Sequence, residues 1–265
     1  MKKGNIFGLL TSAGLLGLAT IGTAAGGPLG EMWLTAGDQN HMFQVSGNTT
    51  TQYALTGNEY GIAVFGSVGA VDVRTQGNNT GILGRQYVNG TPTGTTYSTT
   101  TNQIYDGAQD AATGTIYGID FPTGNVYSFD QNWGNRNYLF TAIGTNDALG
   151  ITFDSSDSTL YCLDRNAAKV SHYTLSGSLL ARFDVLPGSA GLAIDLDGTF
   201  WSLLQGSQNI KHYDHAGNYM GTFSLGTDNN ILGMEIVPSA VPEPTSIAVL
   251  GLGALGLLRR KRAKA

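Results

Sequence analysis

The sequence predicts an all-β fold, a β-propeller of five four-stranded blades closed by strands from the two ends of the chain. Three observations support this prediction. Gly150, Gly191 and Gly233 begin the same phrase roughly 40 residues apart, which is the length of one blade. Each interval holds four short runs separated by turn residues. The chain has 38 glycines and only 12% charged residues, and no long amphipathic pattern indicates a helix.

The two full intervals contain the same four runs in the same order. The first run ends in aspartate, the second carries an aromatic residue, the third contains a His-Tyr pair, and the fourth follows a Gly-containing turn. In sequence these features are Asp154 and Asp195, Tyr161 and Trp201, His172-Tyr173 and His212-Tyr213, and the runs 179–185 and 219–225. Four strands per repeat is the composition of a propeller blade.

The segment 31–55 contains the second, third and fourth runs of a blade but no first run. The missing run appears at the other end of the chain as Gly233–Val237, so we expect it to pair with Met32–Thr35 and close the ring. Closure of this kind removes sheet edges that would otherwise promote aggregation. The first runs then start at five positions, which predict five blades: Gly61, Asp106, Gly150, Gly191 and Gly233.

The pattern weakens between residues 75 and 102, where Gly, Asn and Thr dominate. Here we expect two strands around 82–88 and 95–99, joined by long loops. Loops of this kind usually carry the individual function of a repeat scaffold.

The charge of the body restricts its partners. Between Gly26 and Val241 the chain has 7 basic and 18 acidic residues, a net charge of −11. A field of that sign repels phosphate backbones, so nucleic acid is not an expected partner. The single cysteine, Cys162, cannot form an internal disulfide and is expected to be a small core residue.

The first 25 residues have the features of a secretory signal peptide. Lys2 and Lys3 precede the apolar run Ile6–Ile21, and small residues end the segment at Ala25. We expect cleavage near Ala25, and a retained membrane anchor is the alternative.

The last 25 or so residues combine three features in order: the triplet Pro242, Glu243 and Pro244, a short apolar stretch at 247–258, and the basic cluster Arg259, Arg260, Lys261 and Arg262. This end resembles the PEP-CTERM sorting signal of Gram-negative bacteria. The resemblance implies transient membrane insertion, recognition by an exosortase-type enzyme, removal of the tail, and an organism that makes extracellular polysaccharide. A plain tail anchor is the alternative. The expected domains are a signal peptide at 1–25, a propeller at 26–238 and a sorting tail at 239–265.

The blade phrase Gly-x-x-x-Asp, followed by an aromatic second run, resembles NHL-type repeats. The resemblance is best over 150–225, fair over 104–146 and poor over 61–102. NHL propellers most often have six blades, so a count of five departs from the common form.

Asp110, Asp154 and Asp195 end first runs, and we expect them at one mouth of the central channel. Three carboxylates there would suit Ca²⁺, because this hard cation prefers oxygen ligands. Turn formation is the favoured interpretation, since aspartate in a turn commonly accepts hydrogen bonds from nearby backbone N–H groups, as expected for Asp157 and Asp197. No other cofactor is predicted.

His172 and His212 occupy equivalent positions in the repeat, so packing or blade-to-blade hydrogen bonding is expected. His41 and His215 lie near turns. The chain contains no His-x-x-x-His, Cys-x-x-Cys or Gly-x-Ser-x-Gly pattern, so no catalytic residue is assigned.

Two functions remain. The first is an exported, non-enzymatic binding or structural component of the cell surface or of the extracellular polysaccharide matrix of a biofilm, whose loops contact a glycan or a surface protein. The alternative is a metal-dependent, lactonase-like hydrolase. The apolar residues Phe65 and Val237 interrupt the ring of carboxylates that such an enzyme needs, which favours binding.

Overall fold

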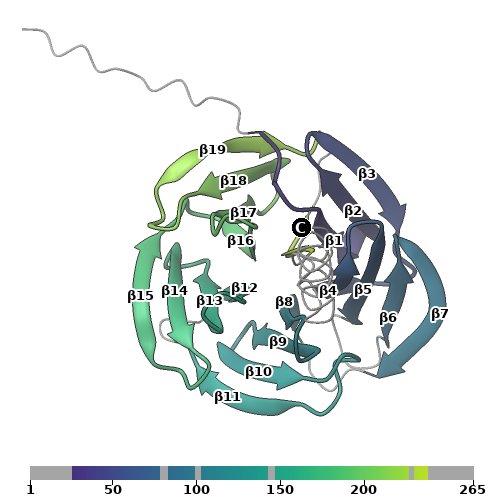
Figure 1. Ribbon diagram of the computed structural model, residues 1–265, viewed down its shortest axis with the longest axis horizontal. Coiled ribbons are helices and arrows are strands. Elements are labelled where there is room, and N and C mark those ends of the chain that lie inside the picture. The colour runs from purple at the N-terminus through teal and green to yellow at the C-terminus, as the bar shows by residue number, and fades with distance from the viewer. Residues whose placement is uncertain (1–25, 78–82, 99–102, 143–146, 227–229, 238–265) are drawn as a thin grey trace, which may run out of the picture.

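The computed structural model describes residues 26–77, 83–98, 103–142, 147–226 and 230–237, which form five antiparallel four-stranded sheets around a central axis (Figure 1).

From the axis outward, the sheets are as follows. Blade 1 comprises β20 (Gly233–Ile236), β1 (Met32–Ala36), β2 (His41–Ser46) and β3 (Thr49–Ala54), with a short 3-10 turn, η1 (Gly37–Gln39), after β1. Blade 2 comprises β4 (Glu59–Ser67), β5 (Ala70–Gly77), β6 (Leu83–Val88) and β7 (Thr91–Ser98). Blade 3 comprises β8 (Ile104–Asp110), β9 (Thr115–Asp120), β10 (Asn125–Phe129) and β11 (Asn137–Thr141). Blade 4 comprises β12 (Ala148–Asp154), β13 (Thr159–Asp164), β14 (Lys169–Thr174) and β15 (Leu179–Asp184). Blade 5 comprises β16 (Ser189–Ile194), β17 (Phe200–Leu204), β18 (Asn209–Tyr213) and β19 (Tyr219–Ser224). The five-bladed propeller predicted from the repeat is confirmed.

The ring closes in blade 1, where β20 pairs antiparallel with β1. Met32 lies opposite Ile236 and Thr35 opposite Gly233, which is the pairing expected from the sequence. The Val237 N–H extends the ladder by donating to the Glu31 carbonyl at 2.8 Å. Blade 1 is therefore built from both ends of the described chain.

The hydrophobic core lies at the seams between blades. One cluster packs blade 1 against blade 5 and contains Trp201 and Met234. A second packs blade 3 against blade 4 and contains Phe153 and Tyr173. Further clusters join blades 1 and 2, blades 4 and 5, and blades 2 and 3. Because neighbouring blades cover both faces of an inner strand, every residue of β12 is buried, whereas the outer strand β15 is largely exposed.

The inner strands meet at a ring of four glycines and one aspartate. Gly61, Gly150, Gly191 and Gly233 hold equivalent positions, and Asp106 takes the fifth place. Gly191 has a φ of +61°, and a Cβ on Gly233 would lie 2.2 Å from the Tyr60 carbonyl oxygen. The repeated glycine is thus required by close backbone approach.

The segment 75–102 is more regular than expected. β6 and β7 are joined by only Asn89 and Gly90, both with left-handed φ angles of +48° and +78°. Asn-Gly is the preferred pair for a two-residue hairpin turn, so the connection is tight and β7 begins at Thr91, before the expected start. Pro92 is tolerated because β7 is an outer edge strand. Residues 78–82 and 99–102 lie outside the described chain.

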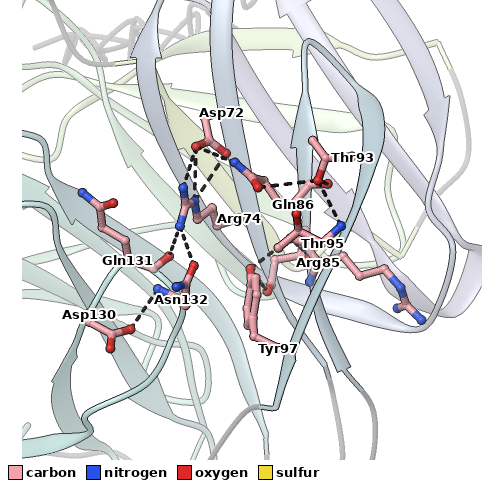
Figure 2. A network of polar contacts seen from close by, with 11 residues as sticks. Asp72, Arg74, Arg85, Gln86, Thr93, Thr95, Tyr97, Asp130, Gln131 and Asn132 are labelled. Atoms are coloured by element: carbon pink, nitrogen blue, oxygen red, sulfur yellow. Dashed lines mark hydrogen bonds and ion pairs between the residues drawn. The ribbon is translucent and has the colours of Figure 1, made fainter.

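A polar network joins blades 2 and 3 at the rim (Figure 2). Arg74 pairs with Asp72 on its own strand at 2.8 Å and donates to the Asn132 side chain at 2.5 Å and the Gln131 carbonyl at 3.1 Å. Gln86 also donates to Asp72, at 3.0 Å. The contacts of Arg74 with Gln131 and Asn132 cross the seam that the apolar cluster of the two blades fills, and they fix the β10–β11 turn against β5.

Candidate functional site

A pocket of about 810 Å³ opens at one mouth of the channel, where the inner strands of blades 3, 4, 5 and 1 end. Its acidic lining residues are Asp110, Asp154, Asp195, Asp197 and Glu235. Hydroxyl groups of the β12–β13 turn and the side chain of His215 line the rim, and Phe153 and Ile194 add apolar surface. The three aspartates considered from sequence as metal ligands therefore share one pocket.

Asp110 and Asp154 shape the turns that follow their strands. Asp110 accepts the Ala112 N–H at 2.9 Å and the Thr113 hydroxyl at 2.7 Å. Asp154 accepts the Ser156 N–H at 2.8 Å. Each is the hydrogen bond that an aspartate makes in a turn, as expected for these residues.

Asp195 has a different role, because four N–H donors converge on its carboxylate. Oδ1 accepts from Gly30 and Leu196 at 2.9 and 2.8 Å, and Oδ2 accepts from Leu29 and the Trp201 indole at 2.8 and 2.9 Å. A carboxylate has about four lone-pair sites, so all are occupied. Asp195 thereby joins blade 5 to the segment that leads into β1.

These contacts do not suit a metal centre. A cation at the mouth would need several carboxylates with free lone pairs converging on one point. Asp195 offers none, and no group of three or more His, Cys, Asp or Glu in the described parts of the chain is spaced to hold a metal ion. The donor set therefore does not fit the Ca²⁺ site considered from sequence.

Asp106 lies at the centre of the ring, and its importance is not evident from the sequence. Its side chain is fully buried and accepts the backbone N–H groups of Ile151, Leu192 and Met234 at 3.1, 2.9 and 2.9 Å. Each donor follows one of the ring glycines. Burial raises the pKa of Asp106 well above its usual range, while the backbone N–H groups act in the opposite direction.

Glu235 is the second residue that the sequence analysis missed. It lies on β20, lines the pocket and is only 4% exposed. Oε1 accepts the Ile236 N–H at 3.1 Å, whereas Oε2 has no hydrogen-bond partner. Burial, and then the nearby Asp106 carboxyl, raise the pKa of Glu235 well above its usual range. An alignment of GMEIV with GITFD and GLAID would have revealed Glu235, because the equivalent residues of the other blades are uncharged: Ala63, Ala108, Thr152 and Ala193.

The repeated histidines belong to a motif inside each blade. The His172 ring stacks on Tyr161, and the His212 ring stacks on Trp201, both at 4.0 Å between centroids. His172 Nε2 lies 2.6 Å from the Thr159 hydroxyl, which donates to Asp157 at 2.5 Å. Thr199 makes the same pair of contacts, with His212 at 2.8 Å and Asp197 at 2.6 Å. The histidines therefore join the second and third strands of one blade and not neighbouring blades, because their side chains stay on the blade face beside the aromatic ring.

The other residues singled out from sequence have separate environments. Cys162 is buried in the seam between blades 3 and 4, as expected, and burial raises the pKa of its thiol. His41 packs edge-on against Phe43, and its Nδ1 has no partner. His215 Nδ1 lies 3.1 Å from the Gly198 carbonyl at the pocket rim.

Across the described ranges, no helix is long and apolar enough to cross a membrane. The sorting signal considered from sequence, with Pro242, Glu243 and Pro244, lies outside the described residues.

Comparison with known proteins identifies this C-terminal signal. Residues 240–262 match the PEP-CTERM protein-sorting motif. The chain is therefore an exported, cell-surface protein, and the motif implies processing by an exosortase. No curated protein matches the chain.

Solved structures share the fold at low sequence identity. A crystal structure of a nidogen–laminin complex contains a chain that is 14% identical, with a TM-score of 0.57, covering 79% of this chain and 98% of that one. A protein of unknown function from Bacteroides thetaiotaomicron is 16% identical, with a TM-score of 0.54 and coverage of 82% and 68%. Myxococcus xanthus glutaminyl cyclase is 14% identical, with a TM-score of 0.50 and coverage of 69% and 82%. The chain is thus an exported β-propeller that carries a PEP-CTERM motif.

Proposed function

We propose that this protein is a non-enzymatic binding module of the cell surface or extracellular polysaccharide matrix, and that it holds its ligand in the channel-mouth pocket. The observation that carries the proposal is the pocket itself, which is large enough for a small ligand or for part of a chain. It lies on a closed ring whose inner strands are fixed by buried hydrogen bonds, so the site is preorganised. The outer strand β7, exposed from Thr91 to Thr96, provides a second contact surface.

Binding is favoured over hydrolysis by the hydrogen bonds of the three aspartates. Asp110 and Asp154 hold their own turns, and Asp195 holds the entry to β1. These contacts give the carboxylates structural roles at the rim. A hydrolytic metal would instead need ligands that are free to converge and an open position for substrate.

The test is retention of the full chain on polysaccharide from the producing organism. Ala111→Trp would fill the pocket from an exposed turn, and we expect it to abolish retention. Ala167→Trp is the matched control, because Ala167 is equally exposed but lies in the β13–β14 turn at the opposite end of the blade. Equal retention of both variants would refute the pocket as the binding site.

The hydrolase alternative is tested on the same preparation. We expect no turnover of a lactone and ester panel with Ca²⁺, Mg²⁺, Mn²⁺ or Zn²⁺. Metal-dependent turnover that Asp154→Ala abolishes, with the fold intact, would replace the binding function with an enzymatic one.

A further inference from the structure

We propose that the channel-mouth pocket binds the ammonium group of an amino sugar, with Glu235 Oε2 as the acceptor deep in the site. This inference rests on the proposed binding function and names the chemical class of its ligand. It is carried by an unpartnered buried carboxyl, by the charge of the pocket wall and by the mixture of surfaces around it.

The first argument is the unsatisfied oxygen of Glu235. A buried acceptor without a partner costs free energy, and native structures rarely leave one without a reason. Oε1 is satisfied by the Ile236 N–H, so the side chain is held in place while Oε2 remains available. Glu235 is 4% exposed and lines the pocket, while Oε2 itself is sealed from solvent. The oxygen therefore lies behind the pocket wall, and we expect a small shift of that wall to bring it into contact with a bound ammonium group.

The second argument is charge. Five acidic side chains line the pocket, together with one histidine, and no lysine or arginine is among the lining residues of the described chain. A concave site with walls of one sign concentrates counter-ions of the other sign. An ammonium group carries three N–H donors and a full positive charge, so it would satisfy Oε2 with a charge-assisted hydrogen bond. An anionic or neutral sugar would leave the same oxygen without a charged partner.

The third argument is the rest of the lining. Ser155, Ser156 and Ser158 place hydroxyl groups at the rim, and Phe153, Ile194 and Ile236 supply apolar surface. A sugar ring presents apolar C–H faces and a belt of hydroxyl groups, which matches this mixture. A simple inorganic cation would use neither surface. Of the aspartates that would ligate it, Asp110 and Asp154 hold their own turns and Asp195 holds the entry to β1.

The experiment compares two oligosaccharides with the same sugar backbone, one with free amino groups and one with N-acetylated amino groups. Oligomers of glucosamine carry free ammonium groups, whereas oligomers of N-acetylglucosamine are neutral. We expect calorimetric titration of the full chain to show about tenfold tighter binding of the glucosamine oligomer. Burial raises the pKa of Glu235 in the empty site, and a bound ammonium group would favour its ionised form. Glu235→Gln keeps the size of the side chain but cannot ionise, so we expect this preference to disappear.

A second pair of variants keeps the proposal testable if Glu235→Gln unfolds the protein. Ala112→Lys places a competing ammonium at the pocket rim, and Ala167→Lys adds the same charge at the opposite face. We expect Ala112→Lys to weaken glucosamine-oligomer binding about tenfold and Ala167→Lys to leave it nearly unchanged. Equal weakening by both variants would show a diffuse charge effect and overturn the proposal.

The controls distinguish a failure of the amino-sugar assignment from a failure of the proposed binding function. Equal affinity for both oligomers, or binding of lysine oligomers without glucosamine oligomers, overturns the amino-sugar assignment. If Ala111→Trp still abolishes retention on the producer's polysaccharide in that case, the pocket remains the binding site for another ligand. If the wild-type chain is not retained on the producer's polysaccharide and binds neither oligomer, the binding function is refuted as well.

Discussion

The Asp106 carboxylate accepts the backbone N–H of Met234 at 2.9 Å, although 128 positions separate the two residues in the chain. The same side chain also accepts N–H groups from Ile151 and Leu192. One residue of blade 3 therefore connects its inner strand to those of blades 4, 5 and 1. In each of these three strands the donor is the backbone N–H of the residue that follows the ring glycine.

Replacing Asp106 with alanine should destabilise the whole ring. The change leaves three buried N–H groups without an acceptor, and each such loss costs about 1–3 kcal/mol. We expect the free energy of unfolding to fall by about 3–5 kcal/mol in urea denaturation. Asp184→Ala is the control, because the Asp184 side chain is 81% exposed and pairs with Lys169 at the surface. A loss for Asp106→Ala no larger than the control would contradict the role assigned to Asp106.

Removing the closing strand should open the ring. A chain that ends at Asn229 lacks β20, which buries all four of its residues. Blade 1 would lose its innermost strand, and β1 would expose a sheet edge. We expect a clearly lower melting temperature and a loss of several kcal/mol of unfolding free energy. Calorimetric melting identical to that of the full chain would show that closure through β20 is unimportant.

The stacked histidines predict a pH dependence of stability. Burial lowers the pKa of both His172 and His212 from the ordinary value of 6.5. The unfolded chain therefore binds protons more readily than the folded one. The two neutral histidines contribute their full stabilisation of the fold above the unfolded pKa, and this contribution is lost as the pH falls through the lower, folded pKa. Urea unfolding at about pH 7.5 and about pH 5.5 measures the difference. We expect the double variant His172→Gln, His212→Gln to show a smaller difference than the wild type, and an unchanged difference would contradict the prediction.

Both ends of the chain should be processed in the native host. We expect the mature protein to lack residues 1–25 and the tail beyond about Pro244, because the termini carry an export signal and a sorting motif. Intact-mass measurement of protein isolated from that host decides the point. A protein that still ends at Ala265 would count against removal of the tail.

The repeat carried most of the fold prediction, and the reason is physical. Each inner strand contacts blades on both faces, so it needs an apolar run. Four of the five inner strands have glycine where they approach the crowded axis, and Asp106 takes that place in blade 3. Gly150, Gly191 and Gly233 mark those starts in the sequence. The missing first run before Met32 then required closure through Gly233–Val237.

The site was less accessible to sequence analysis. Asp110, Asp154 and Asp195 were located because each ends a repeated run, but their hydrogen bonds depend on turns and on a distant segment at Leu29. Asp106 looks like an ordinary polar residue within a strand, and Glu235 stands out only when the five first runs are aligned. Their burial appears only when the ring brings β8 and β20 to one axis.

The exit of β20 beside the pocket has a consequence for how the protein is presented at a surface. Ile236 and Val237 line the pocket, and the Pro-Glu-Pro triplet begins at Pro242. Ten residue steps separate Val237 from the apolar stretch at 247–258, and at about 3.5 Å per extended residue they span no more than about 35 Å. If the tail is inserted in a membrane before it is processed, we expect the mouth to stay within about that distance of the lipid headgroups. We then expect a long polymer to reach the pocket more freely once the tail has been removed.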